Sequence, residues 1–153
     1  MLSLIPPELD QILEEFMSEE RQTLPISDAK FPYFYGVDVG GTNIKIGVLD
    51  DQGRTLAFDR IPTLEADGPE QAIRRSADTC RMLASRIGAR PQDVPRAGLG
   101  APGPMCLRRG LLLNPVNLPN WHNFKIREAL SNALDMPVSF VNDANAAAYG
   151  EFW

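Results

Sequence analysis

The sequence has little of what marks several large classes of protein. It contains one histidine and two cysteines in 153 residues. Cys80 and Cys106 lie far apart and have no metal-ligand spacing, so we interpret both as ordinary thiols in a reducing compartment. A zinc site within this chain is therefore not expected. His122 follows a tryptophan in a loop without a nearby nucleophile pattern, which favours a structural or exposed role.

Basic residues are also scarce, with 15 Lys and Arg against 20 Asp and Glu and a formal net charge of -5. Binding of nucleic acid needs clustered Lys and Arg, so we expect no nucleic-acid partner. No apolar run approaches the length of a membrane span, and the N-terminus has neither the basic region nor the continuous apolar segment of a secretory signal. We therefore expect a cytoplasmic protein without a membrane partner.

The pattern that is present predicts an α/β fold. Five β-type segments are found at 34–39, 44–50, 55–62, 96–101 and 137–143. Short turns join the first three, which predicts an antiparallel meander. Helical patterns over 68–88 and 126–134 precede the last two, which predicts parallel neighbours. The expected sheet is mixed: a three-strand meander extended by two parallel strands. The short apolar segment 107–113 resembles a hairpin-like excursion.

The two ends of the chain also carry helical patterns. Residues 6–20 place an apolar stripe at helical spacing, and residues 144–152 are rich in alanine. The stripe packs either on the domain or on a partner chain, so a homodimer is left open. A linker is expected over 24–32. We accordingly divide the chain into a helical extension and linker, 1–33, and a domain, 34–153.

The stretch DVGGTN, Asp38 to Asn43, is the first candidate site. Gly40 and Gly41 permit a tight turn between strands and leave backbone N–H groups directed into it, beside the Thr42 hydroxyl. Such a turn can hold a phosphate, although a plain Gly-Gly hairpin is the alternative. Asp38 favours the phosphate, because a carboxylate buried inside a strand costs desolvation energy unless it meets a cation. Magnesium carried by a nucleotide is such a cation.

The stretch VNDANAAAYGE, Val141 to Glu151, is the second. Asn142 and Asp143 follow an apolar strand at its C-terminal end, where ligands gather in open α/β sheets. Asp143 is thus positioned to act as a base, and the alternative is a helix N-cap. We expect Asp38, Thr42 and Asp143 to line one cleft at the C-terminal edge of the first, fourth and fifth strands.

Two proline-containing loops, 100–104 and 114–121, follow the fourth strand. Rigid loops carrying Asn117 and exposed backbone groups suit a polyhydroxylated ligand. The alternative is a structural turn with a packed Trp121.

Together the motifs DVGGTNIKIGVLD, GLGAPGP, NPVNLPNW and PVSFVNDANAAAYGE resemble the ROK family of sugar kinases and sugar-sensing repressors. The resemblance covers 36–151 and implies the N-terminal lobe of a ribonuclease H-like, actin-type ATPase fold. The family's second lobe, with its adenosine pocket and zinc-type Cys and His cluster, is expected to lie outside this chain. A lobe that offers a nucleotide only one wall is expected to catalyse poorly.

The resemblance also implies roles for individual residues. Asp143 would be the general base. The remaining contacts would be, for phosphate and magnesium, Asp38, Gly40, Gly41, Thr42, Asn43 and Lys45, and for sugar, Gly103, Asn117, Asn142, Asp143 and Glu151. The implied reaction transfers phosphate from ATP, with Mg²⁺, to a hexose, glucose being the default substrate. A non-enzymatic sugar sensor or repressor is the alternative, but residues 1–33 are too short for a winged-helix domain.

Overall fold

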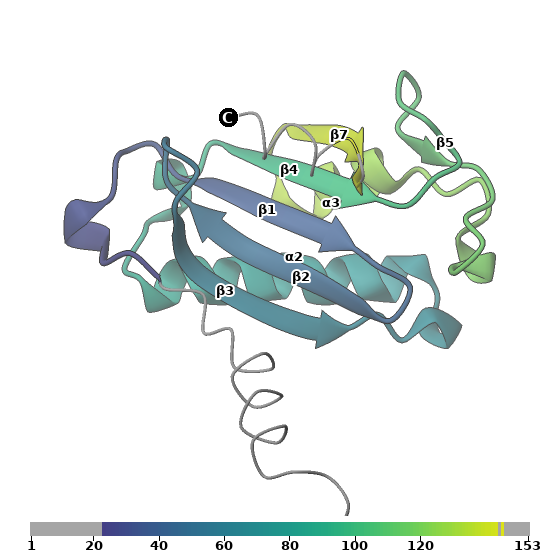
Figure 1. The fold of residues 1–153 in the computed structure, drawn as a ribbon, viewed down its shortest axis with the longest axis horizontal. Helices are drawn as coiled ribbons and strands as arrows, with labels where there is room; N and C mark the ends of the chain where they lie inside the picture. Colours follow the sequence, from purple (N-terminus) through teal and green to yellow (C-terminus); the bar gives the residue numbers. More distant parts are fainter. Residues whose placement is uncertain (1–22, 144, 146–153) are drawn as a thin grey trace, which may run out of the picture.

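A computed structural model describes residues 23–143 and 145 of the chain. A five-stranded mixed sheet in the order β3-β2-β1-β4-β7 forms its centre (Figure 1). The strands are β1 (Phe34–Val39), β2 (Asn43–Leu49), β3 (Thr55–Pro62), β4 (Arg96–Ala101) and β7 (Val138–Asn142). The first three pair antiparallel, whereas β4 pairs parallel with both β1 and β7. The predicted meander with two parallel strands is therefore confirmed.

Alternation of residue types decides which face of the sheet is buried. In β1 the side chains of Tyr35, Val37 and Val39 are buried, and in β2 those of Ile44 and Ile46 are fully buried. The residues between them point to the opposite side, because successive side chains of a strand alternate across the sheet.

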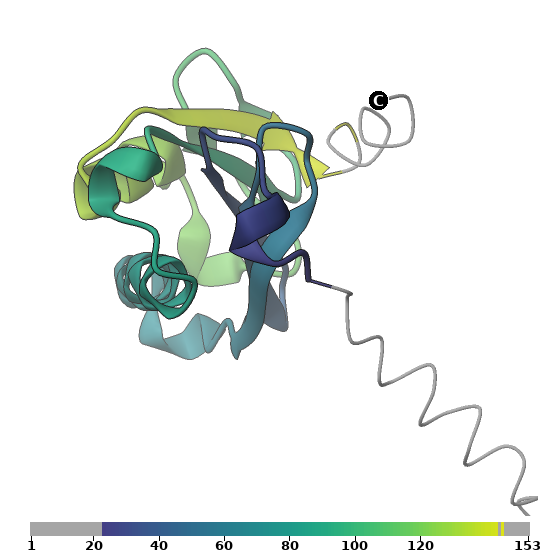
Figure 2. The ribbon, with the colours of Figure 1, turned by 90° about the vertical axis from the view of Figure 1, so that its left-hand side faces the viewer.

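Helices α2 (Pro69–Arg86) and α3 (Ile126–Leu134) pack on the buried side. Figure 2 shows both helices on one side of the sheet. α2 begins at Pro69 after Gly68, whose φ of 85° is a conformation that glycine adopts readily. We call the other side of the sheet, which carries Gly36, Asp38, Lys45 and Gly47, the open face, since neither helix covers it.

The chain between β4 and α3 makes an excursion from the sheet. β5 (Met105–Cys106) pairs antiparallel with β6 (Leu111–Leu112). A hairpin is thus present, as predicted, but its first strand precedes the predicted range 107–113. A short 3₁₀ turn, η4 (Pro119–Trp121), ends the loop that follows. Trp121 is fully buried and meets the ring of Phe124 edge-to-face at 5.8 Å. This large side chain anchors the end of the loop in the core.

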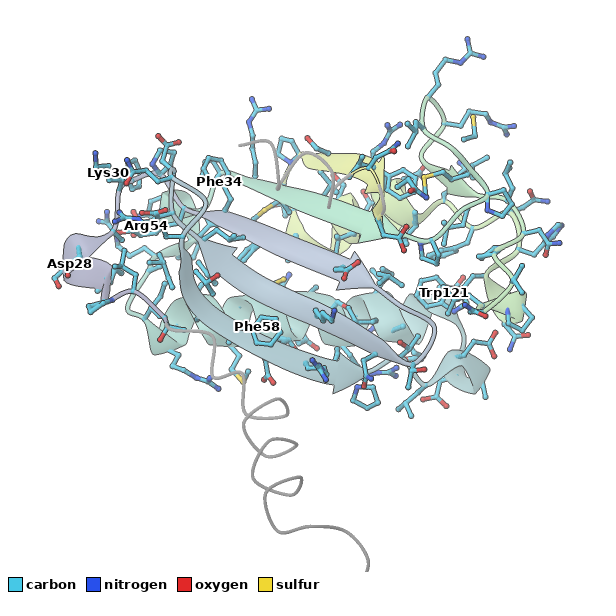
Figure 3. The ribbon with its side chains drawn as sticks, in the orientation of Figure 1. Asp28, Lys30, Phe34, Arg54, Phe58 and Trp121 are labelled. Atoms are coloured by element: carbon cyan, nitrogen blue, oxygen red, sulfur yellow. The ribbon has the colours of Figure 1, made fainter. Side chains whose placement is uncertain are left out.

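Asp50 organises the turn between β2 and β3. Its buried carboxylate accepts hydrogen bonds from the guanidinium of Arg54, at 3.0 and 2.6 Å, and from the N–H groups of Lys30, Gln52 and Arg54. Burial alone would raise the pKa of Asp50, but these hydrogen bonds hold it well below its usual value. Lys30 and Arg54 lie at one end of the sheet, far from Trp121 at the other (Figure 3).

The remaining predictions for the chain ends meet the structure only in part. The predicted helices over 6–20 and 144–152 lie outside the described residues. In the predicted linker, residues Ile26–Asp28 form a 3₁₀ turn, and the Leu24 N–H donates to the Thr55 carbonyl at 2.8 Å. The linker is therefore fastened to the start of β3. In the described part of the chain, no helix has the length and apolar character needed to cross a membrane.

Candidate active site

The C-terminal ends of β1, β4 and β7 lie side by side at one edge of the sheet. In the parallel register Asp38 pairs with Gly100 and Gly100 with Val141. Asp143, two residues beyond Val141, is the first residue with helical conformation after β7. Asp38 and Asp143 thus come from different strands to the same edge.

Gly100 lies between these two carboxylate residues, and its lack of a side chain leaves the space between them open. A Cβ atom on Gly100 would lie 3.4 Å from Oδ1 of Asp38 and 4.0 Å from the Cα of Asp143. A larger residue here would occupy the space between them. Gly103 is similar, because its Cβ would lie 3.4 Å from Nδ2 of Asn142. The loop 100–104 therefore lies close to the Asn142-Asp143 pair.

The turn between β1 and β2 is built around glycine. The Gly40 N–H donates to the Asn43 carbonyl at 3.0 Å, and a Cβ on Gly40 would lie 2.8 Å from that oxygen. The N–H of Gly40 is thus engaged inside the turn, so the phosphate contact that the resemblance implies for Gly40 would not be made through this N–H group. Within the described part of the chain, the N–H groups of Gly41 and Thr42 donate to no protein acceptor. Two adjacent N–H groups of this kind fit a phosphate oxygen.

The loop 114–121 packs directly on this turn. A Cβ on Gly41 would lie 2.7 Å from the Cβ of Asn117 and 3.1 Å from its carbonyl oxygen. Gly41 therefore permits a close approach that any side chain would prevent. The structure brings Asn117, a candidate sugar contact, against the candidate phosphate turn.

Asp38 is exposed, so the argument that its burial demands a cation does not hold for this chain. The reason is the alternation of β1, which directs Asp38 to the open face, opposite Lys45 in the register with β2. A cavity of about 420 Å³ lies on this face, and Asp38, Lys45, Gly100 and Asp143 line one end of it. A carboxylate beside a candidate phosphate turn fits magnesium, which uses one or two carboxylates together with phosphate oxygens.

Thr42 departs from the expected arrangement. It does not line the cavity that Asp38 and Asp143 share, because it lies exposed at the tip of the turn, where its carbonyl accepts the N–H of Thr63. Asn43 begins β2 and is half-buried.

Glu151 lies outside the described residues. Within residues 23–143 and 145, no group of three or more His, Cys, Asp or Glu side chains is placed to hold a metal ion.

The family model for the ROK family matches residues 34–153. The chain belongs to the ROK family. A glucokinase from Thermotoga maritima is 33% identical over 118 residues, which are 77% of this chain and 36% of the relative. A glucokinase from Halalkalibacterium halodurans is 36% identical over 121 residues, again 36% of the relative. A xylose repressor from Bacillus subtilis is 27% identical over 131 residues, 33% of its length. This ROK chain thus spans about a third of the length of these curated relatives.

Solved ROK structures agree with the fold. The ROK hexokinase from Thermus thermophilus superposes with a TM-score of 0.69 at 37% identity, covering 78% of this chain and 38% of that one. A ROK family glucokinase from Streptomyces griseus, in complex with glucose and AMPPNP, gives 0.64 at 30% identity over 78% of this chain and 36% of its own. The predicted actin-type ATPase fold is therefore confirmed.

His122 and Thr63 complete the description of this ROK lobe. His122 is exposed, its Nε2 lies 2.9 Å from Nδ2 of Asn123, and it does not line the cavity with Asp38. Thr63 was not singled out by the sequence, yet it is fully buried and its hydroxyl donates to the Gly40 carbonyl at 2.7 Å. A lone Thr after a strand carries no pattern that distinguishes it, so only the tertiary contact reveals it.

Proposed function

We propose that this chain is the N-terminal lobe of a cytoplasmic sugar kinase that transfers phosphate from ATP to a hexose, with glucose as the first substrate to test. The observation that carries the proposal is the placement of Asp38 and Asp143 along one cavity, on either side of Gly100, beside a turn in which two N–H groups donate to no acceptor in the described part of the chain. The glucokinases among its relatives support the choice of glucose. In this proposal residues 34–153 form the lobe and residues 1–33 an extension without a part in the chemistry.

The phosphate side of the site follows from the β1–β2 turn. The N–H groups of Gly41 and Thr42 would bind oxygens of the transferred phosphate, with Lys45 and Asn43 close by on β2. Asp38 would hold Mg²⁺. The ion, when bound, supplies positive charge that offsets the negative charge of the phosphate oxygens.

The sugar side follows from the loops that meet this turn. Asn117, Asn142 and the backbone at Gly103 would donate and accept hydrogen bonds with the sugar hydroxyls, and Glu151 would join them. Asp143 would accept the proton of the reacting sugar hydroxyl. The oxygen of that hydroxyl would bond to the γ-phosphorus of ATP, and ADP would depart. Phosphoryl transfer demands little further covalent chemistry from the protein, since alignment and charge neutralisation provide most of the catalysis.

Replacing Asp143 by Asn tests this assignment. The substitution keeps the size of the side chain but removes the proton acceptor, and general-base catalysis contributes about 10²-fold to 10⁴-fold. In the full-length protein, we expect kcat for glucose to fall by that factor. The Kd for glucose should change by less than about threefold, since the substitution leaves the contacts that bind the sugar in place. Asp78→Asn, on an exposed part of α2, serves as the matched control.

Three results would count against the proposal. Near-normal turnover in Asp143→Asn would show that the base lies elsewhere. Equal loss in Asp78→Asn would show a general effect on folding. Tight glucose binding by the wild-type protein with no phosphate transfer would favour a sugar sensor, the alternative that the more distant repressor relative represents.

A further inference from the structure

The segment between β3 and α2 holds the candidate phosphate turn. Thr63 follows β3 directly and is fully buried. Its hydroxyl donates to the carbonyl of Gly40 at 2.7 Å, and its N–H donates to the carbonyl of Thr42 at 2.9 Å. These two carbonyls flank Gly41, so one residue fixes the turn on both sides of the position that packs against Asn117.

The same segment also holds the loop that carries Asn117. Glu65 begins the short 3₁₀ turn η2 (Glu65–Asp67). Its Oε1 accepts the backbone N–H of Asn120 at 2.6 Å, and its Oε2 accepts Nδ2 of the same residue at 3.1 Å. Two donors on the two oxygens of one carboxylate fix orientation as well as distance, and the charge strengthens both hydrogen bonds. Asn120 lies three residues after Asn117, next to the buried Trp121.

Arg75 links this segment to helix α2. It projects from α2, and its Nη2 donates to the Thr63 carbonyl at 2.6 Å while its Nη1 lies 3.3 Å from Oδ2 of Asp67. The helix itself is packed on the sheet through a buried stripe. The segment is therefore tied to the core at one side and to both site loops at the other.

We infer that Thr63 and Glu65 are positioning residues, which set the phosphate turn and the Asn117 loop at the separation that transfer requires. Neither residue belongs to the motifs assigned to the site, and each acts through another residue. The inference rests on the proposed kinase function, because only a reaction between two bound substrates needs these two loops to be aligned. Reacting atoms must come within about 3–3.5 Å, and a displacement of about 1 Å can cost 10²-fold in rate.

The test uses shape-matched variants of the full-length protein. Thr63→Val keeps the volume but removes the hydroxyl donor, whereas Thr63→Ser keeps the donor. Glu65→Ala removes both acceptors. We expect Thr63→Val and Glu65→Ala to lower kcat by about 10-fold to 10²-fold, with KM for glucose and ATP much less affected. Thr63→Ser should retain near-normal kcat, and Asp78→Ala should match the wild type.

A merely structural role predicts different effects on stability and on kcat. Thr63→Val and Glu65→Ala would then lower the Tm but leave kcat per folded molecule unchanged, and this result would overturn the inference. Thermal unfolding of each variant determines the folded fraction used in the calculation. Loss of kcat in Thr63→Ser equal to that in Thr63→Val would also contradict it, because the hydroxyl is then irrelevant.

Amide hydrogen exchange separates failure of this inference from failure of the proposed function. We expect the Asn120 N–H to be protected in the wild type and to exchange several-fold faster in Glu65→Ala, whatever the protein catalyses. An unprotected Asn120 in a protein that phosphorylates glucose would remove the positioning role and leave the kinase assignment intact. A protected Asn120 in a protein that phosphorylates no sugar would remove the kinase assignment, and the positioning role with it.

Discussion

Replacement of Gly41 by Ala tests the contact on which the geometry of the site depends. The new Cβ would lie 2.7 Å from the Cβ of Asn117, whereas non-bonded carbon atoms prefer about 3.5–4.0 Å. The backbone at Gly41 is not in the left-handed region, so the cost comes from space alone. Because Asn117 also presents its carbonyl oxygen at 3.1 Å, rotation of a side chain cannot relieve the overlap. The two loops must separate by roughly 0.8 Å or more.

Both stability and turnover should report this separation. Overpacking of a close contact typically costs about 1–3 kcal/mol, so the free energy of unfolding should fall within that range. If the turn and the loop bind the two substrates, kcat should also fall, approaching about 10²-fold for a displacement near 1 Å. Denaturant unfolding followed by fluorescence, together with a coupled assay of ADP release, measures the two quantities on the same preparation.

Gly98→Ala is the matched control for this experiment. Gly98 lies in β4 with an ordinary strand backbone, and the atom nearest to its Cβ would be the Tyr35 carbonyl oxygen at 3.9 Å. Because Gly98 lines the same cavity as Asp38 and Asp143, it serves as the control for stability alone, and the same chemical change should leave the free energy of unfolding close to that of the wild type. If Gly41→Ala unfolds with the same free energy as Gly98→Ala, the turn and the Asn117 loop are not in contact in solution, and the reasoning fails.

Two further predictions concern buried titratable groups. Hydrogen bonds lower the pKa of Asp50 in the folded state, so its stabilisation is present above the unfolded pKa of about 3.9 and is lost as the pH falls towards the folded value. Denaturant unfolding should therefore show a larger fall in stability between about pH 5 and pH 2 for the wild type than for Asp50→Asn, and equal falls would contradict this. Burial raises the pKa of Cys80 to about 12, so at neutral pH a thiol reagent should modify the half-buried Cys106 much faster. Mass spectrometry after timed labelling checks this, with equal rates expected only after denaturation.

Periodicity was sufficient to predict the architecture of the lobe. The alternation in Val37, Asp38 and Val39 and the helical spacing over 126–134 express directly which side chains meet the core. The predicted α3 has the observed bounds, and α2 differs from its predicted range only at the ends. Local pattern and tertiary environment agree in these elements, so the sequence alone determines them.

The geometry of the candidate site could be predicted only in part. Strand ends at one edge of a parallel sheet predicted that Asp38 and Asp143 would share a cavity. The contact of Gly41 with Asn117 and the hydrogen bonds of Thr63 join residues that are distant in sequence. Neither leaves a local pattern, because a Gly-Gly hairpin and a Thr after a strand look the same with or without these partners.

The exposure of Asp38 changes how a cation would be bound at this site. A buried carboxylate without a partner would carry a desolvation cost in the free protein, and the cation would relieve it. Asp38 carries no such cost, since it faces solvent on the open face. Its attraction for a cation is therefore weak in water and grows only when a ligand displaces water from the surroundings. In the proposed kinase, a nucleotide bound at the adjacent turn would do this, and the binding of magnesium and of nucleotide would then depend on each other. The exposure of Asp38 would thus fit a site that its substrates complete rather than one preformed around a metal.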